Sequence, residues 1–201
     1  MYELKDKNAR KTTNKRRMVN TAKECAYLAV FIALVIAAQL VFAAVPGVEL
    51  VTVLFVSYAF VFGWKRGLLA ATAFSILRQF VFGFYPVVLI LYLTHFNFLS
   101  FIFGVLGEKF GKKMHSKIDK STIIILFLLV IIAAAATAGF SLFDNILTPL
   151  WYGYSERARK IYFYASLPFM IPQVICAAVS VSVLFLPLHV AFTYIKRGLR
   201  H

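Results

Sequence analysis

Apolar residues along this chain gather in six long runs separated by short polar stretches. Within a few residues, the runs cover positions 24–45, 47–64, 67–83, 86–108, 121–142 and 166–194. A helix needs about 20 apolar residues to cross a hydrocarbon core about 30 Å thick, and each run falls near or above that length. The pattern predicts an all-α integral membrane protein with six transmembrane helices.

The basic residues predict how these helices are oriented. Of 22 Lys and Arg residues, 18 fall in four places, which are positions 1–23, Lys65 with Arg66, positions 109–120 and the tail from Lys196. Basic residues that flank membrane helices stay on the cytoplasmic side. Two crossings between successive clusters satisfy this rule, so both termini are predicted to be cytoplasmic. The external stretch 143–165 holds only three basic residues, too few to reverse this orientation.

Composition agrees with a lipid environment and argues against other partners. The 201 residues are 61% apolar, and the mean hydropathy is +0.80. A soluble core of this size could not hide so much apolar surface. The net charge of +14 lies in membrane-flanking segments, where anionic headgroups account for it, so no nucleic-acid partner is expected. Residues 1–20 are expected to be a disordered, basic cytoplasmic segment, and 21–201 a single membrane domain.

The sequence lacks the residue patterns of soluble enzymes. The four His residues are far apart, no metal-binding Cys pair is present, and no phosphate-binding loop of the P-loop kind occurs. Cys25 and Cys176 lie at opposite depths and are expected to be free thiols. A membrane enzyme acting on lipids would rest on Glu24 and Glu108 alone. We therefore expect no enzyme, no metal and no cofactor, and any energy for transport would come from a partner protein.

Polar side chains within the runs lie mostly toward the predicted outer side. The set comprises Gln39, Glu49, Arg78, Gln79, Tyr92, His95 and Gln173, with Asn97 near the middle. Polar groups at membrane depth usually face a cavity or each other, because burial in lipid is costly. The asymmetry predicts a cavity that opens to the outside.

Arg78 is the sharpest signal in this set, because a guanidinium inside a span costs roughly 2.5 to 3.5 kcal/mol on insertion scales. It could hold a ligand carboxylate or phosphate. Alternatively, it could pair internally with Glu49 or Asp144, or extend to the headgroups.

Other residues could complete a binding site beside Arg78. Tyr92, Trp151 and Tyr154 would supply stacking surfaces, and His95, Asn97 and Gln173 would supply hydrogen bonds. The 143–165 stretch is expected to be an external loop, either a lid over the cavity or a set of interfacial anchors. Prolines at 168 and 172 predict a kinked or unwound start to the last span. Each of these groups also has a purely structural reading, as packing or interfacial residues.

Small residues one helical turn apart mark the first span. Ala29, Ala33 and Ala37 form a flat ridge that another helix could pack against closely. The ridge could serve a partner protein or a contact within the bundle.

Several features together resemble a known family. Six predicted spans in about 200 residues, the Ala-x-x-x-Ala ridge, and the stretch Pro46-Gly47-Val48-Glu49-Leu50-Val51 followed by Phe62-Gly63, Gly83-Phe84 and Tyr92 resemble the substrate-binding S components of energy-coupling factor transporters. The resemblance covers roughly residues 20–195. Two positions depart from the relatives, which carry Asn where Gly47 stands and often an acidic residue in place of Arg78.

The resemblance implies a bacterial plasma-membrane protein that binds a water-soluble vitamin or related micronutrient from outside. It further implies a transmembrane T subunit and two cytoplasmic ATPases as partners, with Ala29, Ala33 and Ala37 packing against the T subunit. The alternative function is a multi-span scaffold of the bacterial cell envelope, which would have the same topology but no ligand.

Overall fold

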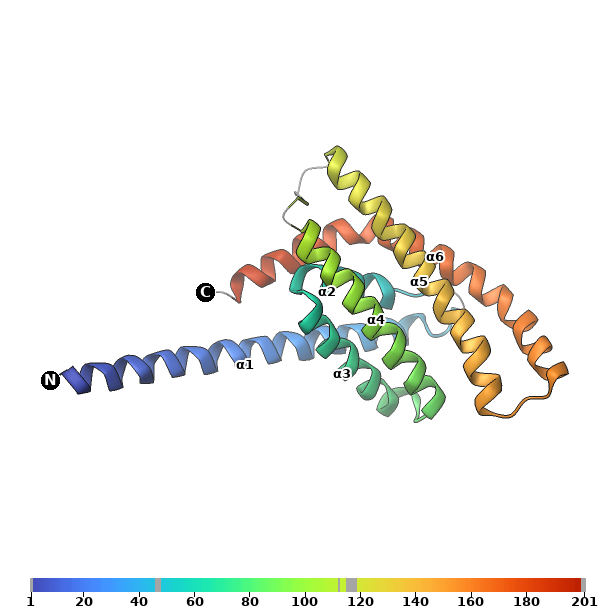
Figure 1. Ribbon diagram of the computed structural model, residues 1–201, viewed down its shortest axis with the longest axis horizontal. Helices are drawn as coiled ribbons and strands as arrows, with labels where there is room; N and C mark the ends of the chain where they lie inside the picture. Colours follow the sequence, from blue (N-terminus) through green and yellow to red (C-terminus); the bar gives the residue numbers. More distant parts are fainter. Residues whose placement is uncertain (1, 46–47, 112, 115–118, 200–201) are drawn as a thin grey trace.

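The computed structural model describes residues 2–45, 48–111, 113–114 and 119–199, with side chains described from residue 21 onward. Residues 2–20, expected to be disordered, are helical here as the first part of α1. This part of the chain forms six α-helices and no strand (Figure 1). They are α1 (Tyr2–Phe42), α2 (Val51–Phe62), α3 (Trp64–Phe82), α4 (Pro86–Phe110), α5 (Lys120–Trp151) and α6 (Glu156–Gly198).

Four of the described helices are long and apolar enough to cross a membrane. They are the Thr21–Phe42 part of α1 together with α4, α5 and α6. Their length and composition indicate a membrane-embedded, multi-pass protein. The all-α prediction is confirmed, whereas six crossings and the orientation of the termini stay predictions.

Helix α2 lies at the centre of the fold. Eleven of its 12 residues are buried, and it packs against α3, α4 and α6. At 1.5 Å per residue the helix is about 18 Å long, well short of the hydrocarbon thickness. The helix is shorter than the predicted span over 47–64, because residues 48–50 are not helical and the helix ends at Phe62, and its crossing of the membrane stays a prediction. Its apolar side chains are buried within the protein.

The core around α2 is aromatic. The Phe55 ring centroid lies 5.2 Å from that of Phe74 and 4.9 Å from that of Phe96, and Phe31 packs edge-on against Phe55. These rings join α1, α2, α3 and α4. Tilted and edge-to-face arrangements of this kind add to the stabilisation from burial.

Two glycines allow α4 to lie directly against α2 and the start of α3. A Cβ on Gly107 would lie 2.0 Å from the Phe60 carbonyl oxygen, and one on Gly104 would lie 2.3 Å from the Trp64 backbone. Gly63 alone separates α2 from α3 and has a φ of 90°, a conformation that glycine adopts readily. The connection between α2 and α3 is therefore a single residue.

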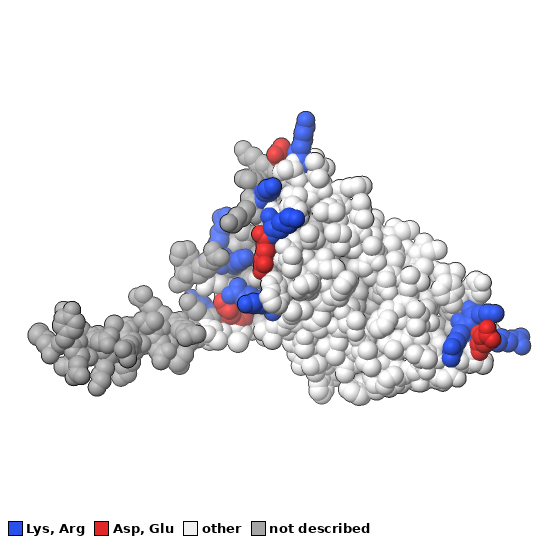
Figure 2. Space-filling model, in the orientation of Figure 1, with Lys and Arg blue, Asp and Glu red and all other residues white. Residues whose placement is uncertain are grey.

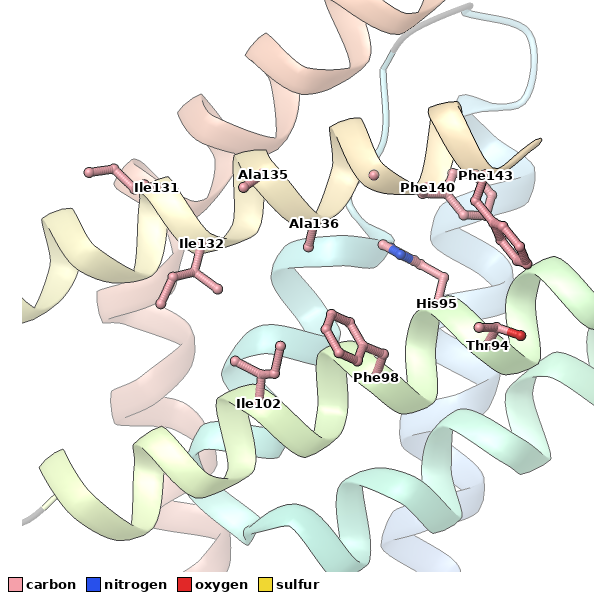
Figure 3. Close-up of a pocket in the computed structure, with 11 residues that line it drawn as sticks. Thr94, His95, Phe98, Ile102, Ile131, Ile132, Ala135, Ala136, Phe140 and Phe143 are labelled. Atoms are coloured by element: carbon pink, nitrogen blue, oxygen red, sulfur yellow. The ribbon is translucent and has the colours of Figure 1, made fainter. Parts of the chain in front are cut away.

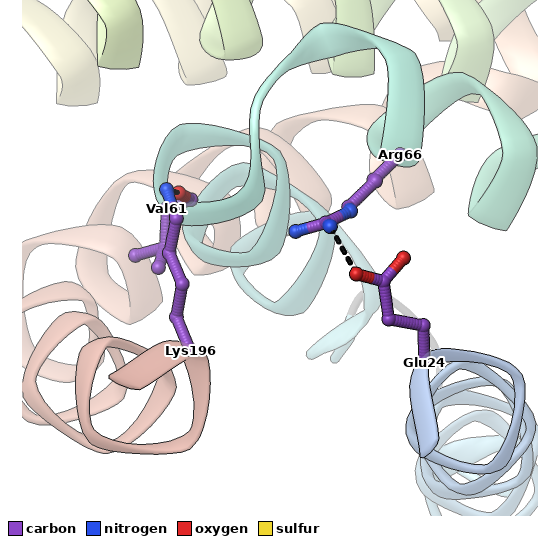
Figure 4. A network of polar contacts seen from close by, with 4 residues as sticks. All are labelled: Glu24, Val61, Arg66 and Lys196. Atoms are coloured by element: carbon purple, nitrogen blue, oxygen red, sulfur yellow. Dashed lines mark hydrogen bonds and ion pairs between the residues drawn. The ribbon is translucent and has the colours of Figure 1, made fainter. Parts of the chain in front are cut away.

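Polar contacts hold together the end of the bundle that carries the Lys65–Arg66 cluster. Arg66 Nη2 pairs with Glu24 Oε1 at 2.5 Å and so ties α3 to α1, and Lys196 Nζ of α6 donates to the Val61 carbonyl oxygen (Figure 4). On the face seen in Figure 2, charged side chains gather at two ends with uncharged surface between them. That distribution is typical of a protein whose middle faces lipid.

The predicted loop over 143–165 is wrong. Helix α5 continues to Trp151 and α6 begins at Glu156, so only residues 152–155 connect them. Within the extension, Asp144 accepts hydrogen bonds from Thr148 and Tyr162, and Ser155 caps α6 by accepting from the Ala158 amide. The predicted unwinding at Pro168 and Pro172 is also absent, because α6 is helical through both and instead bends along its length (Figure 1).

Candidate functional site

A cavity of about 330 Å³ lies at the end of the bundle opposite the Lys65–Arg66 cluster. It is lined by the end of α1, the α1–α2 connection, the first residue of α2, the C-terminal part of α3, the start of α4 and one residue of α6. The lining residues are Gln39, Phe42, Ala43, Val45, Val48, Glu49, Val51, Arg78, Phe82, Tyr92 and Gln173. The volume falls within the range of small-molecule sites, and polar side chains from several elements converge on it, as they do where a ligand is oriented.

Arg78 is fixed in this cavity by neighbours from three helices. Its Nε donates to Gln39 Oε1 at 3.1 Å, and its Cζ lies 4.1 Å from the Tyr92 ring centroid and 4.7 Å from that of Phe82. The residue is 9% exposed, and its Nη1 is buried without a hydrogen-bond partner. A buried guanidinium nitrogen with no acceptor is costly, so this group is suited to receive an anionic ligand group.

Glu49 reaches the same cavity from the α1–α2 connection. Its backbone amide donates to Cys176 Sγ at 3.4 Å, which anchors the connection to α6, and its Oε1 accepts from Thr52 Oγ1.

The internal pairing considered for Arg78 is not formed. No ion pair joins Arg78 to Glu49, and Asp144 hydrogen bonds to Thr148 and Tyr162 instead. Arg78 instead donates to the neutral Gln39 amide oxygen, which cannot cancel its charge.

Three of the predicted binding residues meet at this cavity, and four do not. Arg78, Tyr92 and Gln173 line it. Asn97 accepts from Thr72 and donates to the Leu93 carbonyl oxygen, so its amide is used within α3 and α4. Trp151 is half exposed at the end of α5, and Tyr154 packs near Tyr152 and Tyr162 at the α5–α6 connection.

His95 belongs to a different hollow, a mainly apolar groove of about 480 Å³ between α4 and α5. Figure 3 shows its ring pointing from α4 toward α5, where the ring centroid lies 4.7 Å from that of Phe140. Tyr92 and His95 are only three residues apart on α4 and both contact Phe140, yet Tyr92 lines the Arg78 cavity and His95 lines this groove. The geometry separates the two residues that the sequence had grouped.

Two lining residues, Gln39 and Glu49, were noted as polar groups of the outer half but not expected in the site. The signal available in the sequence was their depth, which matches that of Arg78. Gln39 also donates to the Tyr92 hydroxyl at 2.7 Å and so bridges the two predicted residues.

The alanine ridge on α1 faces outward. Ala29, Ala33 and Ala37 are all exposed, whereas Phe31, Ile32 and Val35 on the other side of α1 are buried in the bundle. The ridge therefore makes no close helix contact within the described part of the chain.

The state of the two cysteines and the possible metal ligands are the last features predicted from the sequence. Cys25 and Cys176 are both free thiols, as predicted. Among the described residues, no three His, Cys, Asp or Glu side chains gather as metal ligands would. The chain matches no family model, and no curated protein or solved structure is significantly similar to it. The resemblance to S components thus stays a prediction.

Proposed function

We propose that this protein is the substrate-binding S component of an energy-coupling factor importer in a bacterial plasma membrane. It would cross the membrane six times, with both termini in the cytoplasm, and bind a water-soluble vitamin or related micronutrient from outside. It would perform no chemistry on that solute. A transmembrane T subunit and two cytoplasmic ATPases would drive its transport.

The observation that carries this proposal is the cavity around Arg78. The cavity lies at the end of α3 away from Lys65 and Arg66, which is the outer end under the positive-inside rule. Its guanidinium keeps a buried nitrogen without a partner, so a ligand would complete a site that the protein leaves incomplete. The exposed alanine ridge on α1 supports the second half of the proposal, since it offers a flat surface to another membrane helix.

An envelope scaffold is the competing function, and the cavity weighs against it. A scaffold has no need to keep a charged group partly unsatisfied inside the bundle. A scaffold would be favoured if Arg78 paired with a carboxylate and no cavity lay beside it. Arg78 instead makes no ion pair with a described carboxylate, and a cavity is present.

Native mass spectrometry of the detergent-purified full chain tests the proposal. A tightly held solute should appear as a small-molecule adduct that survives exchange of lipid and detergent. Absence of any such adduct, together with failure to assemble with T and ATPase subunits from a bacterium that encodes them, would favour the scaffold.

A further inference from the structure

Two oppositely charged residues line the Arg78 cavity without pairing with each other. Arg78 comes from α3 and Glu49 from the α1–α2 connection, and the ion pairs of the described residues do not include them. A basic and an acidic side chain that share a small cavity normally pair with each other, because each loses hydration on burial. Here the fold holds them apart.

The contacts of Arg78 explain why it does not swing toward Glu49. The Nε hydrogen bond to Gln39 and the Tyr92 and Phe82 rings on its flanks fix the plane of the guanidinium. Gln39 is itself held, since its Nε2 donates to the Tyr92 hydroxyl. The remaining buried donor, Nη1, is the part of Arg78 left for an acceptor from outside the protein.

The contacts of Glu49 leave a corresponding gap. Thr52 donates to Oε1, and the described residues provide no hydrogen bond or ion pair to Oε2. The backbone of Glu49 is tied to Cys176, which acts as donor to the Glu49 carbonyl and acceptor from its amide. The carboxyl group is thus positioned from both ends and keeps one oxygen available.

The rest of the wall is suited to an uncharged middle section of a ligand. Phe42, Val45, Val48, Val51 and Phe82 are apolar, and the Gln173 amide adds a single neutral polar group. An anion alone would give Arg78 Nη1 an acceptor but would leave Glu49 Oε2 without a donor. A cation alone would face the corresponding problem with Arg78.

We propose that the cavity selects a compact amphoteric molecule, whose anionic group binds Arg78 and whose protonated amine or similar cationic group binds Glu49. The molecule carries an apolar or aromatic body between its two charges. This inference rests on the proposed binding function and names the substrate class of that same site.

The test uses matched probes that differ only in charge. One set comprises para-aminomethylbenzoate, para-methylbenzoate and para-methylbenzylamine, and a second comprises phenylalanine, phenylpropionate and phenethylamine. Binding to the purified full chain is followed by thermal shift and titration calorimetry. In at least one set, the zwitterion should bind about 10-fold or more tighter than either singly charged analogue, the size expected for one charged hydrogen bond.

Variants assign each charge to its residue. Glu49→Gln should abolish the advantage of the zwitterion over the carboxylate, and Arg78→Gln should abolish its advantage over the amine. Glu108→Gln, which removes a carboxylate at the opposite end of α4, should leave both preferences unchanged. Thermal melting of each variant without ligand checks that it folds.

Several outcomes would overturn the inference. Equal binding of the carboxylate and the zwitterion would do so, as would unchanged selectivity in Glu49→Gln or no binding of any probe. The molecule recovered by native mass spectrometry provides a separate reading. A recovered solute that is a plain anion would overturn the amphoteric assignment while the binding function stands, whereas no recovered solute and no assembly would count against the binding function itself.

Discussion

Gln39 and Arg78 join α1 to α3 at the floor of the cavity, with Arg78 Nε 3.1 Å from Gln39 Oε1. The two residues are 39 positions apart in the sequence and come together because both helices pack beside each other. The same Gln39 amide donates to Tyr92 of α4. One neutral side chain therefore orients a cation without cancelling its charge, and the charge stays available to a ligand.

Removal of the guanidinium should weaken ligand binding. Arg78→Ala is expected to reduce the affinity for the co-purifying solute by about 1.5 to 3 kcal/mol, the value of a hydrogen bond to a charged group. Titration calorimetry on the solute-stripped protein measures the change. Arg157→Ala, which removes a guanidinium near the start of α6, is the matched control and should leave affinity unchanged. Equal affinities for Arg78→Ala and the parent protein would exclude Arg78 from the site.

Depth in the membrane was readable from the sequence, but side-chain direction was not. The basic clusters and apolar runs identified the outer polar set, and Arg78, Tyr92 and Gln173 do line one cavity. His95 is only three residues from Tyr92 on α4, yet it lines the groove between α4 and α5 and not the Arg78 cavity. Which face of a helix turns inward depends on how the helices pack together, and no single run of residues contains that information.

Polar composition also misled the assignment of residues 143–165. The polar composition here, with Asp144, Asn145 and the basic residues after Glu156, favoured a loop. A helix can nevertheless continue into polar surroundings where its side chains form hydrogen bonds with one another. Asp144 with Thr148, and Asn145 with Ser166, do so here. Ser155 followed by Glu156 was a helix-start signal that could have corrected the boundary.

The close contact of α4 with α2 predicts that replacing two different glycines with alanine will change the stability of the protein by very different amounts. Gly107→Ala would place a methyl group 2.0 Å from the Phe60 carbonyl oxygen, so the backbones would have to separate. We expect a loss of stability of about 1 to 3 kcal/mol or more, the usual cost of overpacking. Gly139→Ala on α5 is the control, because its Cβ would meet nothing within 4 Å. Thermal unfolding in detergent compares the two, and similar melting temperatures would contradict the close contact.

The exposed ridge on α1 predicts where a T subunit docks. Ala33→Trp should abolish or strongly reduce co-purification with the T and ATPase subunits, because an indole would hold the two helices apart. Solute binding by the isolated chain should persist, since Ala33 does not line the cavity. Leu34→Trp introduces the same ring about 100° around α1 at another exposed position and should leave assembly intact. Loss of assembly in both variants, or in neither, would exclude the ridge as the docking surface.

The orientation of the helices makes a prediction that chemical labelling can check. In a variant with Cys25 and Cys176 replaced by Ser, a new cysteine at Arg157 should react with a membrane-impermeant maleimide added to intact cells. A cysteine at Lys65 should react only after the membrane is permeabilised. The expectation follows from the basic clusters, since Lys65 belongs to a cytoplasmic cluster and the α5–α6 connection is an odd number of crossings away. Labelling of both positions from the same side would contradict the six-span topology and, with it, the outward opening of the Arg78 cavity.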